Sequence, residues 1–155
     1  FNDFPHGRRV TFDQLLPLFE LLGKNIVYQG SSGNGQRTKM ANQIAVAAGM
    51  IGVCEALAYA ASSGLEPRTV LKSIESGAAG SWALTNLAPR ILDQDFEPGF
   101  FVKHFIKDLN IALDSAERSS IDLPGLRLAL QRYKELAREG HEESGTQALS
   151  HLYKT

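Results

Sequence analysis

The chain has 155 residues, enough for one ordinary domain, and 43% of them are hydrophobic and 21% charged. These fractions are typical of a soluble globular protein with a hydrophobic core. Sixteen Lys and Arg against seventeen Asp and Glu leave a formal net charge of −1, which disfavours binding to nucleic acid or to a membrane surface. A single cysteine, Cys54, excludes an intrachain disulfide, and no apolar run reaches the roughly 18 residues of a membrane span. We therefore expect a cytoplasmic protein.

The first thirty residues predict one short helix and one strand. Residues 1–10 are polar and predict an irregular segment, and Phe1 at the start, without a signal peptide, suggests a piece of a longer protein. Thr11 is the expected cap of a helix that contains Pro17, a sign of a kink or a late start, and that ends at Gly23. Residues 25–29 then predict a strand. A lone strand forms no sheet, so we expect its partner to come from a part that is missing.

A long helix is predicted over residues 36–63. The glycine-rich stretch 30–35 before it fits neither the G-x-G-x-x-G nor the Walker pattern, so a plain hinge is the favoured interpretation. The helix is apolar nearly all round and rich in Ala and Gly, which predicts burial in the middle of the fold with other helices packed closely on it. Glu55 interrupts it, which argues against a membrane span, and Gly64 is expected to end it.

Further helices are predicted along the rest of the chain. They cover about 67–76, 82–93, 101–118 and 124–139, with Pro67, Ser81 and Pro124 at their starts, Gly140 closing the fourth, and a last short helix capped by Thr146. The predicted fold class is therefore all-α: a helical bundle with one long buried central helix, preceded by a helix–strand remnant.

Polar side chains that could carry chemistry gather near the start of the long helix. Lys39, Asn42 and Gln43 are spaced i, i+3, i+4 and share one face. A lysine there suits a general acid/base, and the two amides could bind a hydroxyl or carboxylate. The alternative, favoured on spacing alone, is a solvated helix start. Lys107 and Asp108 are adjacent, so they do not face each other, and a polar stripe is again the simpler interpretation.

The remaining reactive side chains suggest no metal site and no nucleophile. Cys54 lies among apolar residues and is expected to be a buried small hydrophobe. The histidines lack metal-ligand spacing. They are His6, His104, His141 and His151.

Four motifs, in order, resemble those of the β-hydroxyacid dehydrogenases, a family that includes 3-hydroxyisobutyrate dehydrogenase and tartronate semialdehyde reductase. Residues 33–43 (GNGQRTKMANQ) resemble the family signature G-x-G-Q-x-x-K-x-x-N-[NQ]. The further landmarks are GAAGSW (77–82), DFEPGF (95–100) and KDLNIAL (107–113). The resemblance covers residue 11 to the C-terminus.

The resemblance implies a role for each of these motifs. Lys39 would be the catalytic lysine that exchanges a proton with the substrate oxygen while hydride moves to or from NAD or NADP. Asn42, Gln43 and Gly35 would bind the substrate, a small carboxylate. The cofactor-side residues would be Lys107, Phe100 and Asp108.

The resemblance also implies a domain organisation. Residues 1–30 would be the C-terminal remnant of an NAD(P)-binding Rossmann domain, and 31–155 an all-α substrate and dimerisation domain like the C-terminal domain of 6-phosphogluconate dehydrogenase. The Rossmann part, which binds most of the cofactor, is absent, so the chain by itself is expected to be inactive. The long helix would hold a homodimer or higher oligomer. A dimerisation module without activity and an imine reductase relative are the alternatives.

Overall fold

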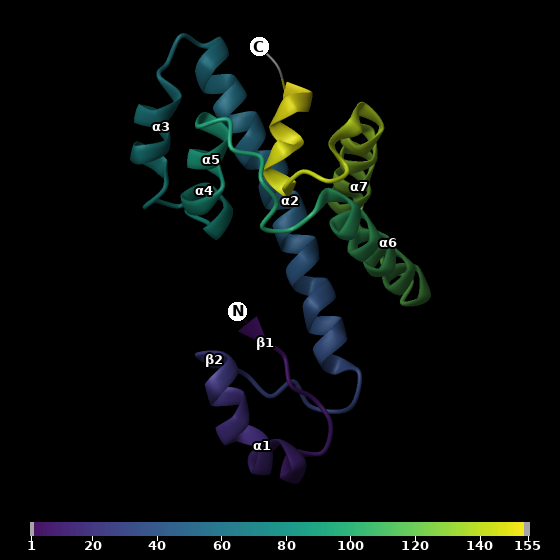
Figure 1. The fold of residues 1–155 in the computed structure, drawn as a ribbon. Helices are drawn as coiled ribbons and strands as arrows, with labels where there is room; N and C mark the ends of the chain where they lie inside the picture. The colour runs from purple at the N-terminus through teal and green to yellow at the C-terminus, as the bar shows by residue number, and fades with distance from the viewer. Residues whose placement is uncertain (1, 154–155) are drawn as a thin grey trace. The chain divides into compact units, whose positions relative to one another are not determined.

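The computed structural model describes residues 2–153, and the side chains of 4–153. The chain forms two compact units, Phe1–Gln43 and Ile44–Thr155, and each is described by itself. The division falls inside the long helix α2 (Asn34–Ser62; Figure 1). The domain boundary predicted at residues 30 and 31 stays a prediction.

The first unit combines a two-stranded parallel sheet with one helix. Strand β1 (Asn2–Asp3) pairs with β2 (Asn25–Ile26), and α1 (Arg9–Leu22) connects them. The predicted strand over 25–29 is therefore shorter than expected. The expectation that its partner lies outside the chain is also wrong, because β1 supplies one.

Helix α1 begins earlier than predicted. Its N-cap is Arg8, which offers no side-chain cap, so Thr11 lies inside the helix instead of capping it. Pro17 is also inside and exposed, and the carbonyl it leaves unpaired, four residues back at Asp13, can be hydrated. Gly23 ends the helix as predicted.

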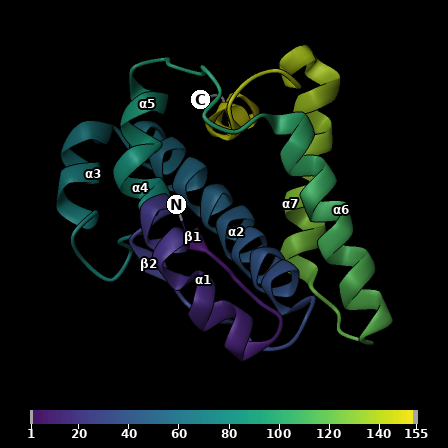
Figure 2. The ribbon, with the colours of Figure 1, turned by 60° about the horizontal axis from the view of Figure 1, so that its bottom comes forward.

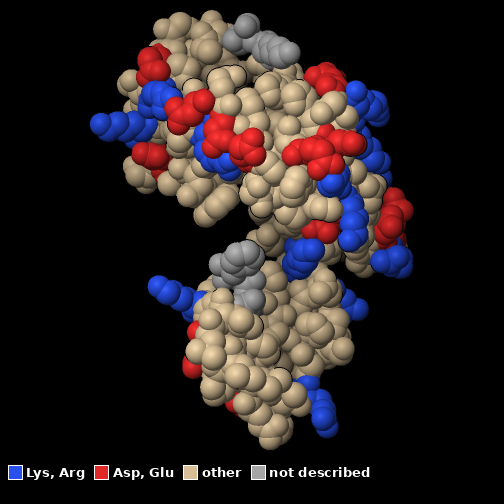
Figure 3. Space-filling view, viewed as in Figure 1, with Lys and Arg blue, Asp and Glu red and all other residues tan. Residues whose placement is uncertain are grey.

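Aromatic rings form the centre of the first unit. The Phe12 ring lies 6.0 Å from that of Phe19 and 5.0 Å from that of Tyr28, and the Tyr28 hydroxyl donates to the main-chain oxygen of Gly7 at 2.6 Å. Most leucines of α1 remain exposed, and Figure 3 shows few charged side chains on this unit's visible face. The unit thus carries apolar surface that its own residues do not cover.

Helix α2 is buried along one side only. Its buried side includes Ala47, Met50 and Cys54, whereas a stripe of small residues on the other side is exposed. The stripe consists of Ala45, Ala48, Gly49 and Gly52. The prediction of burial all round is therefore wrong for this stripe.

Helix α2 also meets the length and composition of a membrane span. With a mean hydropathy of 1.8 over its most apolar window, it is the one helix of the described residues that does so. The core helix of a soluble protein passes the same test.

The second unit is a set of short helices around the C-terminal part of α2 (Figures 1 and 2). In chain order they are α3 (Pro67–Ile74), α4 (Trp82–Asn86), α5 (Ala88–Leu92), α6 (Val102–Arg118), α7 (Pro124–Leu136), the π-helical turn η1 (Ala137–His141) and the 3₁₀ helix η2 (Thr146–Tyr153). The all-α prediction is confirmed.

Local signals explain most of these boundaries. Pro67 and Pro124 each occupy a first helical position, and the Ser81 hydroxyl caps α4 by accepting from the Leu84 N–H at 3.1 Å. The single helix predicted over 82–93 is wrong, because two short helices meet at Leu87, next to Pro89, which has no N–H to continue the first one.

The end of the fourth predicted helix also differs. Helix α7 stops at Leu136 and the chain continues through η1, which contains Gly140 with a φ of 94°. The backbone there is left-handed, a conformation that glycine adopts without strain.

Helices α6 and α7 lie side by side in both ribbon views (Figures 1 and 2), and η2 packs against α7. The Phe105 and Tyr133 rings meet edge to face with centroids 4.9 Å apart, and both side chains are fully buried. The Tyr133 hydroxyl donates to the main-chain oxygen of Thr146 at 3.1 Å, which ties η2 to α7. This packing fixes α6, which carries two of the predicted site residues.

Candidate active site

The start of α2 is built against the N-terminal segment of the first unit. A Cβ at Gly35 would lie 2.1 Å from the main-chain oxygen of Phe4 and 2.3 Å from His6 Cδ2, so only glycine fits there. His6 Nδ1 accepts a hydrogen bond from the Gly33 N–H at 3.1 Å. Gly35 thus allows a close approach of backbone to backbone at the helix start, and Gly33 adopts a left-handed φ of 88° just before it.

The predicted catalytic lysine and amides follow within the next two turns of α2. Lys39 is half-buried, Asn42 is exposed, and Gln43 is only 8% exposed. Asn42 Nδ2 donates to Gln43 Oε1 at 3.2 Å. This bond fixes the Gln43 amide with its oxygen toward Asn42, so its Nε2 donor points away from Asn42.

The other predicted site residues lie in the second unit, around the start of α6. The Phe100 side chain is 39% exposed, and its ring packs edge to face on that of Phe105 at 5.9 Å. Lys107 is exposed and Asp108 is 5% exposed, so the two neighbours point to different environments as predicted. A buried carboxylate needs polar partners, and Asp108 has them.

Charge at the start of α6 is partly neutralised. Lys103 Nζ lies 2.5 Å from Glu143 Oε1, and it also lies 5.3 Å above the Phe101 ring. Figure 3 shows basic and acidic side chains interspersed on the visible face of the second unit. Lys103 therefore adds no uncompensated positive charge beside Lys107.

The structure thus brings the predicted residues together in two groups. Gly35, Lys39, Asn42 and Gln43 share the helix start of the first unit, and Phe100, Lys107 and Asp108 share one segment of the second. How the two groups combine stays a prediction. Trp82, the last residue of the GAAGSW motif, is 69% exposed at the start of α4.

The cysteine and the histidine pair of the second unit are not assigned to this site. Cys54 is buried, and burial, with a smaller effect of the Glu55 charge, raises the pKa of its thiol to about 12. Such a thiol is a poor nucleophile, as predicted. The His141 and His151 rings stack with centroids 4.4 Å apart, but residues 2–153 contain no group of three or more potential metal ligands.

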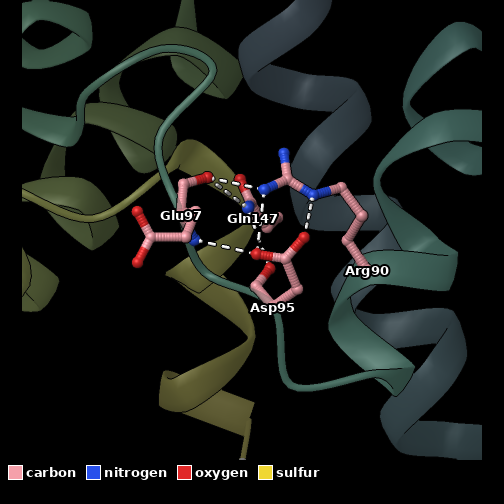
Figure 4. Close-up of polar contacts among 4 residues, drawn as sticks. All are labelled: Arg90, Asp95, Glu97 and Gln147. Carbon is pink, nitrogen blue, oxygen red and sulfur yellow. Dashed lines mark hydrogen bonds and ion pairs between the residues drawn. The ribbon is translucent and has the colours of Figure 1, made fainter.

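The sequence did not predict a polar cluster on the loop that leads to Phe100, formed by Arg90, Asp95 and Gln147 (Figure 4). The hydrogen bond from Arg90 lowers the pKa of the Asp95 carboxyl, and the same contact raises the pKa of Arg90. Arg90 and Asp95 carry opposite charges five residues apart across the end of α5, and this spacing is only a weak indication of an ion pair. Gln147, distant in the sequence, gave none.

A comparison with protein families decides where the chain belongs. The family described as NAD-binding of NADP-dependent 3-hydroxyisobutyrate dehydrogenase matches residues 33–153. The chain belongs to this family. The resemblance inferred from the four motifs is thereby confirmed.

Individual relatives agree with this family. An uncharacterized oxidoreductase of Bacillus subtilis is 60% identical over 147 residues, which cover 95% of this chain and 51% of the relative. The 2-hydroxy-3-oxopropionate reductase of Escherichia coli is 38% identical over 92% of this chain and 49% of its own length.

The fold matches as well. The crystal structure of 3-hydroxyisobutyrate dehydrogenase from Salmonella typhimurium superposes with a TM-score of 0.88 at 24% identity, over 95% of this chain and 52% of that one. The chain therefore spans about half the length of the relatives it matches.

Proposed function

We propose that this family member is the α-helical part of an NAD(P)-dependent oxidoreductase that interconverts a small 3-hydroxy acid and its aldehyde or keto acid by hydride transfer. The observation that carries the proposal is membership of an NAD-binding dehydrogenase family over residues 33–153, in a chain that has a lysine and two amides at the start of α2. The lysine and the two amides match the family signature at the spacing where the proposed chemistry needs them.

Lys39 is the general acid/base of the proposed reaction. In the oxidative direction its Nζ takes the proton from the substrate hydroxyl, and in the reductive direction it returns a proton to the carbonyl oxygen. Its half-buried place in the second turn of α2 supports this role, because a side chain held by its neighbours needs little reordering to reach one oxygen atom.

Asn42 and Gln43 bind the substrate in this proposal. Their mutual hydrogen bond of 3.2 Å orients both amides, and side-chain amides are groups that can hydrogen-bond a carboxylate or a hydroxyl. Gly35 contributes through its missing side chain, since the backbone packed around it leaves no space for a Cβ. The substrate class is then a small carboxylate, as the name of the Escherichia coli relative suggests.

The residues of α6 and of the loop just before it fit one end of a nicotinamide dinucleotide. The partly exposed Phe100 ring offers an apolar surface, and the exposed Lys107 ammonium offers a positive charge and N–H donors. Asp108, buried on the same helix, supports the position of this segment. The bound nicotinamide supplies the site that accepts or gives the hydride. The preference between NAD and NADP would depend on residues outside this chain.

We also propose that a Rossmann domain accompanies the chain and that residues 1–30 belong to it. A two-stranded parallel sheet is too small to be stable by itself. Exposed leucines on α1 need a cover, and Leu18, Leu21 and Leu22 are 57%, 82% and 71% exposed. The relatives' double length would accommodate such a domain.

The exposed stripe of α2 supports a homodimer or higher oligomer. Small side chains let two helices approach closely, and the stripe is apolar for most of its length. Ala48→Glu should then shift the protein toward monomer in light scattering, whereas Ser73→Glu on exposed α3 should not. An unchanged oligomeric state for Ala48→Glu would contradict this interface. A cytoplasmic location is part of the same proposal, and cell fractionation tests it.

The proposed activity is tested with the full-length protein. We expect turnover of at least one small 3-hydroxy acid with NAD or NADP, followed by the absorbance of the reduced nicotinamide. The 155-residue chain alone should give none. No turnover by the full-length protein with any such acid would favour the alternative, a dimerisation module without activity. Turnover by the short chain would overturn the proposed need for a Rossmann domain.

A further inference from the structure

The loop between α5 and α6 is closed by one arginine (Figure 4). Arg90 Nε donates to Asp95 Oδ2 at 2.7 Å, and its Nη2 donates to Asp95 Oδ1 at 3.0 Å and to the main-chain oxygen of Glu97 at 2.7 Å. Asp95 Oδ1 also accepts from the Glu97 N–H at 3.1 Å. The guanidinium thus binds a carboxylate through two parallel bonds and the following turn through a third.

A buried glutamine holds the same loop from the C-terminal side. Gln147 is 1% exposed, and its Nε2 donates to the main-chain oxygens of Asp95 at 3.0 Å and Glu97 at 3.2 Å. A Cβ at Gly145 would lie 2.3 Å from Gln147 Oε1, so the chain is shaped around this amide. Arg90 and Gln147 together satisfy the carbonyl of Glu97.

Main-chain hydrogen bonds also connect the C-terminal segment to Phe100 and to the start of α6. The Gly145 N–H donates to Phe96 O at 2.8 Å, and the Thr146 N–H donates to Phe100 O at 3.2 Å. The first N–H groups of α6, at Val102 and Lys103, donate to the carbonyls of Ser144 and Glu142. Segment 142–147 therefore caps α6 and fixes where that helix begins.

We infer that Arg90 and Gln147 are positioning residues, which hold segment 95–102 so that Phe100 and Lys107 meet the nicotinamide cofactor. This inference rests on the proposed function. Neither residue needs to touch the cofactor itself. Their effect passes through the loop backbone to the Phe100 ring and to the first turns of α6.

This role differs from a general contribution to stability. The side chains of Arg90 and Asp95 are 30% and 43% exposed, and ion pairs that water reaches this freely add little to global stability. The geometry of the pair is what lysine cannot reproduce, because a lysine ammonium lacks the planar fork of donors. Arg90→Lys should therefore change cofactor binding more than it changes the melting temperature.

The test compares two arginines of the same neighbourhood in the full-length oxidoreductase. Arg68 pairs with Asp93, the C-cap residue of α5, which lies before segment 95–102, so Arg68→Lys is the matched control. We expect Arg90→Lys to raise the KM for NAD(P) about fivefold or more with kcat nearly unchanged, the pattern for lost uniform binding. Gln147→Leu should do the same, and both should speed amide hydrogen exchange over 95–102.

The outcomes separate this inference from the proposed function. Equal KM values for Arg90→Lys, Arg68→Lys and wild type, in an active enzyme, would overturn the positioning role. Equal hydrogen exchange over 95–102 would overturn it too, even if Gln147→Leu failed to fold. A wild-type enzyme without turnover would overturn the proposed function instead.

Discussion

The side-chain amide of Gln147 donates a hydrogen bond of 3.0 Å to the main-chain oxygen of Asp95, although the two residues are 52 positions apart. The bond joins η2 to the loop before α6. It shows how the C-terminal segment of the chain, which carries none of the predicted site residues, fixes the surroundings of Phe100. The family motif at 95–100 is thus held by residues outside the motif.

Gly35→Ala tests the close approach at the start of α2. The new methyl group would meet Phe4 O and His6 Cδ2 at 2.1 and 2.3 Å. Such overpacking should lower the free energy of unfolding by about 1–3 kcal/mol in urea denaturation. Gly125→Ala in α7 is the control, since nothing lies within 4 Å of its Cβ, and alanine should stabilise that helix slightly. Equal stability of Gly35→Ala and wild type would contradict the packing described.

Tyr133→Phe tests the link between α7 and η2. The change removes the hydroxyl that donates to Thr146 O at 3.1 Å and leaves that buried carbonyl without this partner. We expect a loss of about 1–3 kcal/mol in the free energy of unfolding, measured by chemical denaturation. Tyr59→Phe should have almost no effect because Tyr59 is 71% exposed. A Tyr133→Phe protein as stable as Tyr59→Phe would exclude an energetic role for the bond.

Burial of Cys54 predicts a loss of stability at alkaline pH. Its thiol has a pKa of about 12 in the folded chain against a usual value of 9.0. The unfolded chain therefore binds fewer protons between these values, and the stabilising contribution is fully present below pH 9.0 and lost as the pH rises toward about 12. In that range the free energy of unfolding should fall more steeply, by up to about 1.4 kcal/mol per pH unit, in wild type than in Cys54→Ala.

The measurement is urea denaturation at a series of pH values from neutral to about pH 11. Tyr133, whose pKa is raised first by burial and then by the charge of Cys54, is present in both proteins, so the difference between the two curves reports Cys54 together with its effect on Tyr133. Parallel curves would mean that the thiol titrates alike in the folded and unfolded chains.

The helical class and most helix starts could be predicted from local chemistry. Pro67 and Pro124 mark helix starts through their fixed φ, and Ser81 does so through a capping bond to Leu84, so all three act within one turn and short-range patterns capture them. The prediction of Thr11 as the N-cap was wrong because several neighbouring residues could begin this helix. The backbone is extended at Arg8, so the helix begins at Arg9. The partner of β2 lies more than twenty residues away at β1, and a two-residue strand carries no periodic pattern.

In the candidate site, too, the residues set by local spacing could be predicted and those set by tertiary contacts could not. Lys39, Asn42 and Gln43 share a face because of helical spacing alone, so the sequence predicted that cluster. Arg90 and Gln147 escaped prediction because their partners are carbonyls of a loop whose course depends on tertiary packing. Burial was also misjudged, since the apolar sequence of α2 does not reveal that the Ala48 and Gly49 side stays uncovered in this chain.

The central claim is that Lys39 is the general acid/base, and the kcat of Lys39→Ala in the full-length oxidoreductase tests it most directly. Loss of a general acid/base should reduce kcat about 10²–10⁴-fold, while NAD(P) still binds and Lys72→Ala, on exposed α3, keeps wild-type kcat. A near-normal kcat for Lys39→Ala would contradict the account.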